Sequence, residues 1–220
     1  MLKARRAGRF YSKICGVTTS IDAGFAIAAG ADAVGINLFP GSKRYVRPEE
    51  AFALAESLAG KIDRVAVVVN PGTAELEVLR NAQCFDAIQF HGNESPGLCA
   101  GCGFDTWIKA VHLGDTAAVD AALSYETPYL LLDSARPGEW GGTGHRLDWD
   151  LAREFVLANP DRKVFLAGGL NPANIREALR IVRPYGADVA SGVEATPPTK
   201  DEYLVREFVA QAASVSAPPE

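Results

Sequence analysis

The sequence predicts a single-domain α/β protein, a (βα)8 TIM barrel that spans residues 1–220. Eight short runs rich in Val, Ile, Leu and Phe recur along the chain, and stretches with helical spacing lie between most of them. Strands that are apolar on both faces and alternate with helices are typical of a parallel sheet. Eight such units favour a closed barrel over an open doubly wound sheet, because Gly16-Val17-Thr18-Thr19 lacks the Gly-x-Gly-x-x-Gly turn common in such sheets.

The elements follow one another in regular order. The predicted strands are residues 10–15, 33–38, 64–69, 87–90, 106–110, 129–133, 163–167 and 188–190. Each predicted helix opens with a residue that caps a helix or suits its first turn, such as Ser20, Pro48 or Asp201. The predicted helices are residues 20–29, 48–58, 74–81, 116–123, 151–159, 171–181 and 201–213. The interval 94–102 is rich in Gly and Cys and is left open, and we expect frayed ends at 1–9 and 214–220.

Composition and charge exclude several functional classes. No uninterrupted apolar run is long enough for a membrane helix, so we expect no membrane partner. The net charge of -5 disfavours nucleic acid as a partner, because such proteins need a basic face. The basic N-terminus is not followed by the apolar core of a signal peptide, and free cysteines suit a reducing compartment, so we expect a cytoplasmic protein.

Polar side chains lie at the ends of the predicted strands, where barrels of this kind place their functional groups. Because side chains alternate along a strand, Lys13 shares a face with Cys15, and Gln89 shares one with His91. Cys15 also fits a small buried apolar position, and Asp133 fits a turn cap. An acid at the end of a leucine run is costly to bury unless it is used, so we expect Cys15 and Asp133 to face each other across the barrel mouth.

Glycine-containing turns follow the last three predicted strands. Small residues let backbone N–H groups approach an anion closely, and a helix N-terminus adds partial positive charge. Barrels that take phosphorylated substrates commonly bind phosphate in this region. The sequence therefore predicts a small-molecule phosphorylated substrate, held by Gly142, Thr143, Gly144, Gly168, Gly169, Ser191 and Gly192.

Two other motifs have competing interpretations. Cys99-Ala100-Gly101-Cys102 has the spacing of half a zinc site, but no second pair completes it, so we expect packed thiols and no metal. Ser42-Lys43-Arg44-Tyr45 is either a solvated basic turn or a carboxylate clamp, and its spacing does not decide between them.

Taken together, these motifs resemble the phosphoribosylanthranilate isomerase family of tryptophan biosynthesis. The matching strings are KICGVT at 13–18, GADAVGIN at 30–37, SKRYV at 42–46, QFHGNE at 89–94, LLLDS at 130–134, GGTG at 141–144, LAGGLNPANI at 166–175, and SGVE with KD within 191–201. The chain departs from the family pattern at Lys43, where proline is common, at Asn37-Leu38, where the family is more aromatic, and before Lys200, where a glycine is usual.

The resemblance implies an isomerase that converts N-(5-phosphoribosyl)anthranilate to 1-(2-carboxyphenylamino)-1-deoxyribulose 5-phosphate by an Amadori rearrangement, with no cofactor. It implies that Asp133 is the acid that protonates the ribose ring oxygen and that Cys15 is the base that removes a proton from the neighbouring carbon. It also implies that Arg44 binds the anthranilate carboxylate and that Gln89 and His91 lie near the substrate.

These roles make opposite demands on the two groups. Asp133 needs a raised pKa to keep its proton near neutral pH, and Cys15 needs a lowered pKa to be a thiolate. Lys13 is a candidate for lowering the pKa of Cys15. Alternatively, Asp188 on the adjacent strand neutralises Lys13 in a buried pair.

Other functions remain open at this level. Related phosphosugar barrels, such as the histidine-pathway isomerase or indoleglycerol phosphate synthase, use two aspartates or a lysine with a glutamate. A catalytically silent barrel that binds a phosphorylated metabolite is the alternative from a different class. The sequence does not decide whether the protein is a monomer or a homodimer.

Overall fold

A computed structural model describes residues 2, 6–112, 122–134 and 148–218, and it shows the predicted closed barrel of eight parallel strands. Strand order follows the chain, and β8 pairs with β1 to close the barrel. The strands are β1 Tyr11–Cys15, β2 Ala33–Asn37, β3 Asp63–Val68, β4 Ala87–Phe90, β5 Trp107–His112, β6 Tyr129–Asp133, β7 Lys163–Leu166 and β8 Gly186–Val189.

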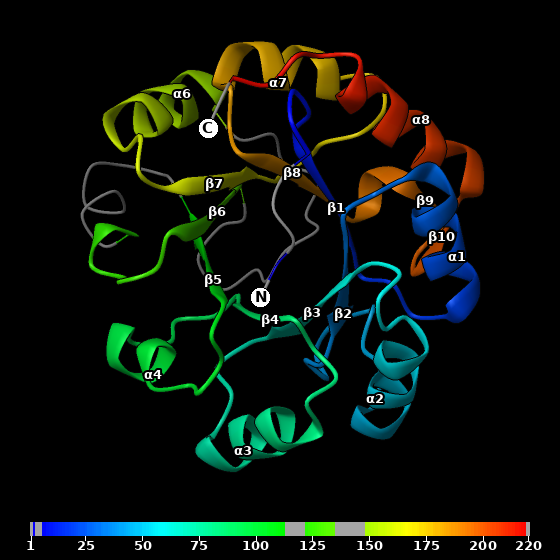
Figure 1. Cartoon of the computed structure of the whole chain (residues 1–220), viewed down its shortest axis with the longest axis vertical. Helices are drawn as coiled ribbons and strands as arrows, with labels where there is room; N and C mark the ends of the chain where they lie inside the picture. Colours follow the sequence, from blue (N-terminus) through cyan, green and yellow to red (C-terminus); the bar gives the residue numbers. More distant parts are fainter. Residues whose placement is uncertain (1, 3–5, 113–121, 135–147, 219–220) are drawn as a thin grey trace.

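Helices surround the barrel on its outside (Figure 1). They are α1 Ser20–Ala29, α2 Pro48–Ser57, α3 Thr73–Ala82, α4 Pro96–Ala100, α6 Trp149–Ala158, α7 Ile175–Val182 and α8 Glu202–Ala213. A 3-10 turn, η1 Ser191–Val193, and a hairpin of β9 Glu194–Thr196 and β10 Thr199–Lys200 follow β8. Among the described helices, none is long and apolar enough to cross a membrane.

The predicted elements differ from the observed ones mainly at their ends. The helix predicted for 171–181 begins at Ile175, because Asn171 and Asn174 form a turn in which each side-chain oxygen accepts a backbone N–H bond. The open interval 94–102 contains α4. Most of the helix predicted for 116–123 lies outside the described residues.

Alternation along the strands separates two apolar cores. Tyr11 and Leu131 belong to the cluster inside the barrel, whereas Ile14, Leu130 and Leu132 belong to the layer between strands and helices. The side chains at alternate positions on the inner face reach the barrel mouth at the carboxyl ends of the strands. This parity places Cys15 and Asp133 on the face that the sequence predicts for them.

Both ends of the described chain contact the barrel. Leu2 is buried in the inner cluster, Val215 is buried after α8, and the N–H of Ala217 donates to the carbonyl of Gly8 at 3.0 Å. These contacts do not measure motion, so the expectation that residues 1–9 and 214–220 are frayed stays a prediction.

Candidate active site

A pocket lies at the carboxyl ends of the barrel strands. The predicted site residues that line it are Cys15, Arg44, His91, Asp133, Gly168, Gly169 and Ser191. Gln89 is fully buried beside His91, and Gly192 follows Ser191 in η1. Gly142, Thr143 and Gly144 lie outside the described residues.

Cys15 ends β1 next to a buried ion pair. Lys13 is paired in register with Asp188 of β8, and its Nζ lies 2.7 Å from Asp188 Oδ1. The structure therefore contains the buried pair that was one of the two alternatives for Lys13. Burial raises the pKa of Cys15 and Asp188 raises it further, and these effects outweigh the lowering by Lys13, Lys200 and Arg44. The structure does not supply the lowered Cys15 pKa that the base role needs, because burial and Asp188 together outweigh Lys13.

Asp133 ends β6 and contacts His91 from β4. His91 Nε2 lies 3.2 Å from Asp133 Oδ2, and the N–H of Ser134 donates to Asp133 Oδ1 at 2.7 Å. Burial alone would raise the pKa of Asp133, but the hydrogen bonds from His91 and from the Ser134 N–H hold it below its usual value. The expectation of a raised Asp133 pKa was wrong, because the hydrogen bonds from His91 and Ser134 outweigh the burial among leucine neighbours.

Gln89 determines how His91 is oriented. Its side-chain Nε2 lies 3.0 Å from His91 Nδ1, at the opposite side of the ring from Asp133. With the amide nitrogen facing Nδ1, that ring nitrogen accepts, and the imidazole proton lies on Nε2, where it donates to Asp133. Two residues that share a face of β4 thus form one hydrogen-bonded chain that ends at Asp133.

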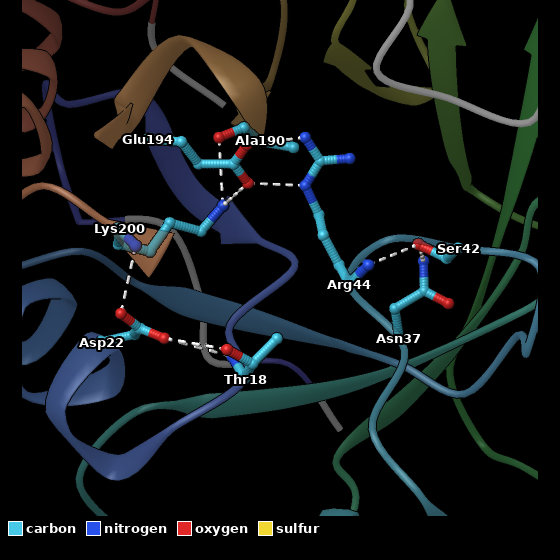
Figure 2. Close-up of polar contacts among 8 residues, drawn as sticks. All are labelled: Thr18, Asp22, Asn37, Ser42, Arg44, Ala190, Glu194 and Lys200. Atoms are coloured by element: carbon cyan, nitrogen blue, oxygen red, sulfur yellow. Dashed lines mark hydrogen bonds and ion pairs between the residues drawn. The ribbon is translucent and has the colours of Figure 1, made fainter. Parts of the chain in front are cut away.

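Arg44 lies on the loop after β2, which internal hydrogen bonds shape (Figure 2). Asn37 Nδ2 donates to Ser42 Oγ at 3.1 Å, and the N–H of Arg44 donates to the same oxygen at 3.1 Å. Gly16 has φ +72°, and a Cβ there would lie 2.2 Å from Arg44 Cδ, so only glycine leaves room for this side chain. Asn37, one of the departures from the family pattern, therefore holds the loop, while Lys43 is exposed.

Two residues that sequence reasoning did not assign to the site form a hydrogen-bonded cluster with Arg44: Glu194 contacts Arg44, and Lys200 contacts Glu194. Glu194 accepts from Arg44 Nε at 2.5 Å and from Arg44 Nη2 at 2.7 Å, and from Lys200 Nζ at 2.8 Å (Figure 2). Burial alone would raise the pKa of Glu194, but the bonds from Arg44 and Lys200 lower it. Burial lowers the pKa of Lys200. The strings SGVE and KD contain both residues, and their match to the family pattern was the available signal.

The glycine turns after β7 and β8 approach each other at the pocket. Gly168 and Gly169 both have positive φ, which turns the chain directly after β7. A Cβ at Gly192 would lie 1.9 Å from the carbonyl oxygen of Leu170, so the two loops pack backbone against backbone. Gly168, Gly169 and Ser191 of these loops line the pocket, which is where an anion site would need backbone amides.

The remaining cysteines are buried free thiols away from the pocket: Cys84, Cys99 and Cys102. Burial raises the pKa of Cys99 to about 12. Within the described residues, no group of three or more His, Cys, Asp or Glu side chains is arranged to hold a metal ion.

The chain is similar to one family over most of its length. Residues 12–211 match the family described as N-(5'phosphoribosyl)anthranilate (PRA) isomerase. The N-(5'-phosphoribosyl)anthranilate isomerase of Chromohalobacter salexigens is 43% identical over 209 residues, which cover 94% of this chain and 95% of the relative.

Solved structures give the same result. Phosphoribosyl anthranilate isomerase from Thermotoga maritima superposes with a TM-score of 0.83 at 38% identity, covering 94% of this chain and 100% of that one. An isomerase in complex with reduced 1-(o-carboxyphenylamino)-1-deoxyribulose 5-phosphate gives 0.80 at 36% identity, with coverage of 94% and 100%. A third structure, of monomers of the dimeric Thermotoga maritima isomerase, gives 0.79 at 37% identity, with coverage of 94% and 100%.

Proposed function

Because the chain belongs to the N-(5'-phosphoribosyl)anthranilate isomerase family, we propose that Cys15 and Asp133 perform the two proton transfers of that isomerisation. The enzyme isomerises N-(5'-phosphoribosyl)anthranilate in tryptophan biosynthesis. The observation that supports the two assignments is that a thiol and a carboxyl group from opposite sides of the barrel line one pocket together with Arg44.

The reaction opens the ribose ring and then moves a proton between carbons. Asp133 donates its proton to the ring oxygen as the bond from C1 to that oxygen breaks, which gives a Schiff base at C1. Cys15, as thiolate, takes the proton from C2, and the C2 electron pair forms the double bond of an enolamine. In the last step C1 gains the proton that Cys15 holds and the C2 hydroxyl proton passes to the Asp133 carboxylate, which gives the ketone product and restores both groups. General acid and base groups each contribute about 10²- to 10⁴-fold to such steps.

The hydrogen-bonded chain through His91 lets Asp133 carry a proton. When Asp133 is protonated, its O–H can donate to His91 Nε2, and the imidazole proton then lies on Nδ1. Gln89 must then present its oxygen to Nδ1, which requires a half-turn of its amide. Among the described residues, Gln89 Oε1 is buried with no hydrogen-bond partner, so the present orientation is not fixed by a second bond.

The two ends of the substrate are held by different parts of the pocket. Arg44 binds the anthranilate carboxylate, because its guanidinium lines the pocket while Glu194 holds its Nε and Nη2 from behind. Backbone amides bind the phosphate, as in other barrels with glycine-rich loops after the last strands. The residues assigned to that role are Gly142, Thr143, Gly144, Gly168, Gly169, Ser191 and Gly192.

The test is an assay of two variants on freshly generated phosphoribosylanthranilate, followed by anthranilate fluorescence. Cys15→Ala and Asp133→Asn should each lower kcat by about 10²- to 10⁴-fold with a smaller change in KM. Cys102→Ala is the matched control, because Cys102 is a buried thiol outside the pocket. Near-normal kcat in either pocket variant would refute the role of that residue.

We also propose where and in what state the enzyme works. The four cysteines are all free, which suits a reducing cytoplasm. The Thermotoga maritima relative is described as dimeric, and the present chain is either a monomer or a homodimer. Light scattering on the purified protein distinguishes these two states.

A further inference from the structure

Lys200 is a buried ammonium group that the reaction steps do not use. Its side chain is fully buried, and its Nζ donates to Glu194 Oε1 at 2.8 Å and to the carbonyl of Ala190 at 3.0 Å. Its backbone N–H donates to Asp22 Oδ1 at 3.1 Å, which ties the hairpin to α1 (Figure 2). Burying a lysine this completely costs free energy, so its position needs a reason.

The hairpin after η1 brings Lys200 and Glu194 together. Lys200 of β10 is in register with Glu194 of β9, and residues directly opposite in an antiparallel pair have adjacent side chains. Neither residue lines the pocket, whereas Arg44 does. Of the described residues that line the pocket, Arg44 is the one that the Glu194 side chain contacts, so Lys200 and Glu194 affect binding of the substrate carboxylate through Arg44.

The three ionised groups carry a net positive charge. Glu194 Oε1 is shared by Arg44 Nε and Lys200 Nζ, and Oε2 accepts from Arg44 Nη2. Two cations thus share one carboxylate. Without Lys200, Arg44 and Glu194 would form a neutral bidentate pair, and a neutral pair attracts an approaching anion only weakly. Figure 2 shows the remaining terminal nitrogen of Arg44 pointing away from Glu194.

We propose that Lys200 determines the specificity of the enzyme for a carboxylated aryl amine. By taking part of the negative charge of Glu194, it leaves Arg44 with an unbalanced positive charge at the pocket wall, which the substrate carboxylate neutralises. Lys200 is thus a positioning and charge-setting residue that acts through Arg44. The inference rests on the proposed role of Arg44 as the carboxylate clamp.

The test compares two ligands on each variant. One ligand is reduced 1-(o-carboxyphenylamino)-1-deoxyribulose 5-phosphate, and the other is the same compound without its carboxyl group. Lys200→Met should weaken binding of the carboxylated ligand by about 10-fold or more, since it removes a charge in a buried setting, and should change binding of the carboxyl-free ligand by less than about 3-fold. Equal changes for both ligands would overturn the proposal.

A double variant separates charge from structure. Glu194→Gln combined with Lys200→Met restores one net positive charge on Arg44, so the preference for the carboxylated ligand should recover above that of Lys200→Met alone. A purely structural role predicts that the double variant is no better than the single one. Lys200→Gln keeps a donor to Glu194 without a charge; it should lose the preference as Lys200→Met does, and retention of the preference would overturn the proposal.

Arg44→Met distinguishes failure of this inference from failure of the proposed function. If Arg44→Met leaves the preference for the carboxylated ligand intact, then Arg44 is not the clamp, and both proposals fall. If Arg44→Met abolishes the preference while Lys200→Met does not alter it, only the role of Lys200 is refuted.

Discussion

The surroundings of Cys15 favour a protonated thiol and those of Asp133 favour an ionised carboxylate, whereas the reaction needs a thiolate and a carboxylic acid. Burial and Asp188 keep the thiol protonated, and His91 with the Ser134 N–H keeps the carboxylate ionised. The reactive form, thiolate with carboxylic acid, contains the same number of protons as this resting form. Their ratio is therefore independent of pH between the pKa values of the two groups.

Because the resting and reactive forms contain the same number of protons, the pH dependence of the enzyme can be predicted. The ordinary pKa values are 3.8 for Asp133 and 9.0 for Cys15, and the structure moves them further apart. We expect kcat/KM, which reports ionisations of the free enzyme, to have no limb from either group between these values. The measurement is a kcat/KM profile together with the rate of Cys15 alkylation against pH, with Cys15→Ala as the background. A limb near neutral pH that coincides with Cys15 alkylation would contradict the prediction.

At the scale of single residues, the sequence predicted where Cys15 and Asp133 lie but not their protonation states. Strand parity placed Cys15 and Asp133 on the inner face, because each ends a recognisable apolar run. Their pKa shifts depend on distances to Asp188 and His91, which lie on other strands and are fixed only when the barrel closes. Glu194 was missed as a site residue because its partner Arg44 lies 150 residues away in the sequence.

Single elements were predicted best where apolar runs are long. β6 matches its predicted bounds because Tyr129–Asp133 contains an unbroken run of three leucines, whereas the start of β8, a Gly-Ala-Asp-Val segment with little apolar character, was predicted two residues late. The hairpin of β9 and β10 was not predicted, because each strand is too short to show alternation.

Helix α1 provides a test of how glycine acts at two positions of one helix. Thr19 caps its start by accepting from the Asp22 N–H, and Gly30 ends it with φ +78°. Gly24 lies within the helix, and a Cβ there would meet no atom within 4 Å. We expect Gly24→Ala to raise the free energy of unfolding by about 0.5–1 kcal/mol, since alanine loses less backbone entropy on folding.

The matched variant lies at the other end of the same helix. Gly30→Ala should lower the free energy of unfolding by about 1–2 kcal/mol, because an L-residue is strained in the left-handed region. Urea denaturation of both variants measures the two effects. If both variants shift stability in the same direction, backbone conformation is not what distinguishes these glycines.

Acid stability is a property of the whole molecule. The pKa values of Asp86, Asp133 and Glu194 are lowered in the folded state, chiefly because hydrogen bonds from Arg64, His91 and Arg44 overcome the effect of burial. A carboxyl group with a depressed folded pKa adds stability above its unfolded pKa, near 3.8 for Asp and 4.5 for Glu, and that stability is lost as pH falls through its folded pKa.

We therefore expect the free energy of unfolding to fall as the pH is lowered below about 5. Asp32 opposes this trend, because burial raises its folded pKa, but it is one carboxyl group against three. Urea titrations at several pH values provide the measurement. Asp86→Asn, which removes one lowered group far from the pocket, should flatten the dependence; an unchanged slope would show that Asp86 does not contribute.

The closed barrel also needs its amino-terminal end filled. The inner cluster there includes Tyr11, whose hydroxyl donates to Asp63 at 2.6 Å, and Phe165, whose ring meets that of Tyr11 edge to face at 5.5 Å between centroids. Leu2 is buried in the same cluster, with 6% of its surface exposed. A residue near the start of the chain thus reaches the core, in a segment that the sequence predicts to be frayed.

The variant Leu2→Ala tests whether Leu2 packs inside the barrel or belongs to a frayed end of the chain. If Leu2 packs in the barrel, its truncation should lower the free energy of unfolding by about 2–3 kcal/mol, since it removes buried methyl groups and leaves a cavity. Leu157→Ala on α6 is the matched control; that side chain is 66% exposed, and its truncation should change stability by less than about 0.5 kcal/mol. Because the two substitutions delete the same atoms, equal effects in urea denaturation would mean that Leu2 spends its time in solvent and that the barrel end is closed without it.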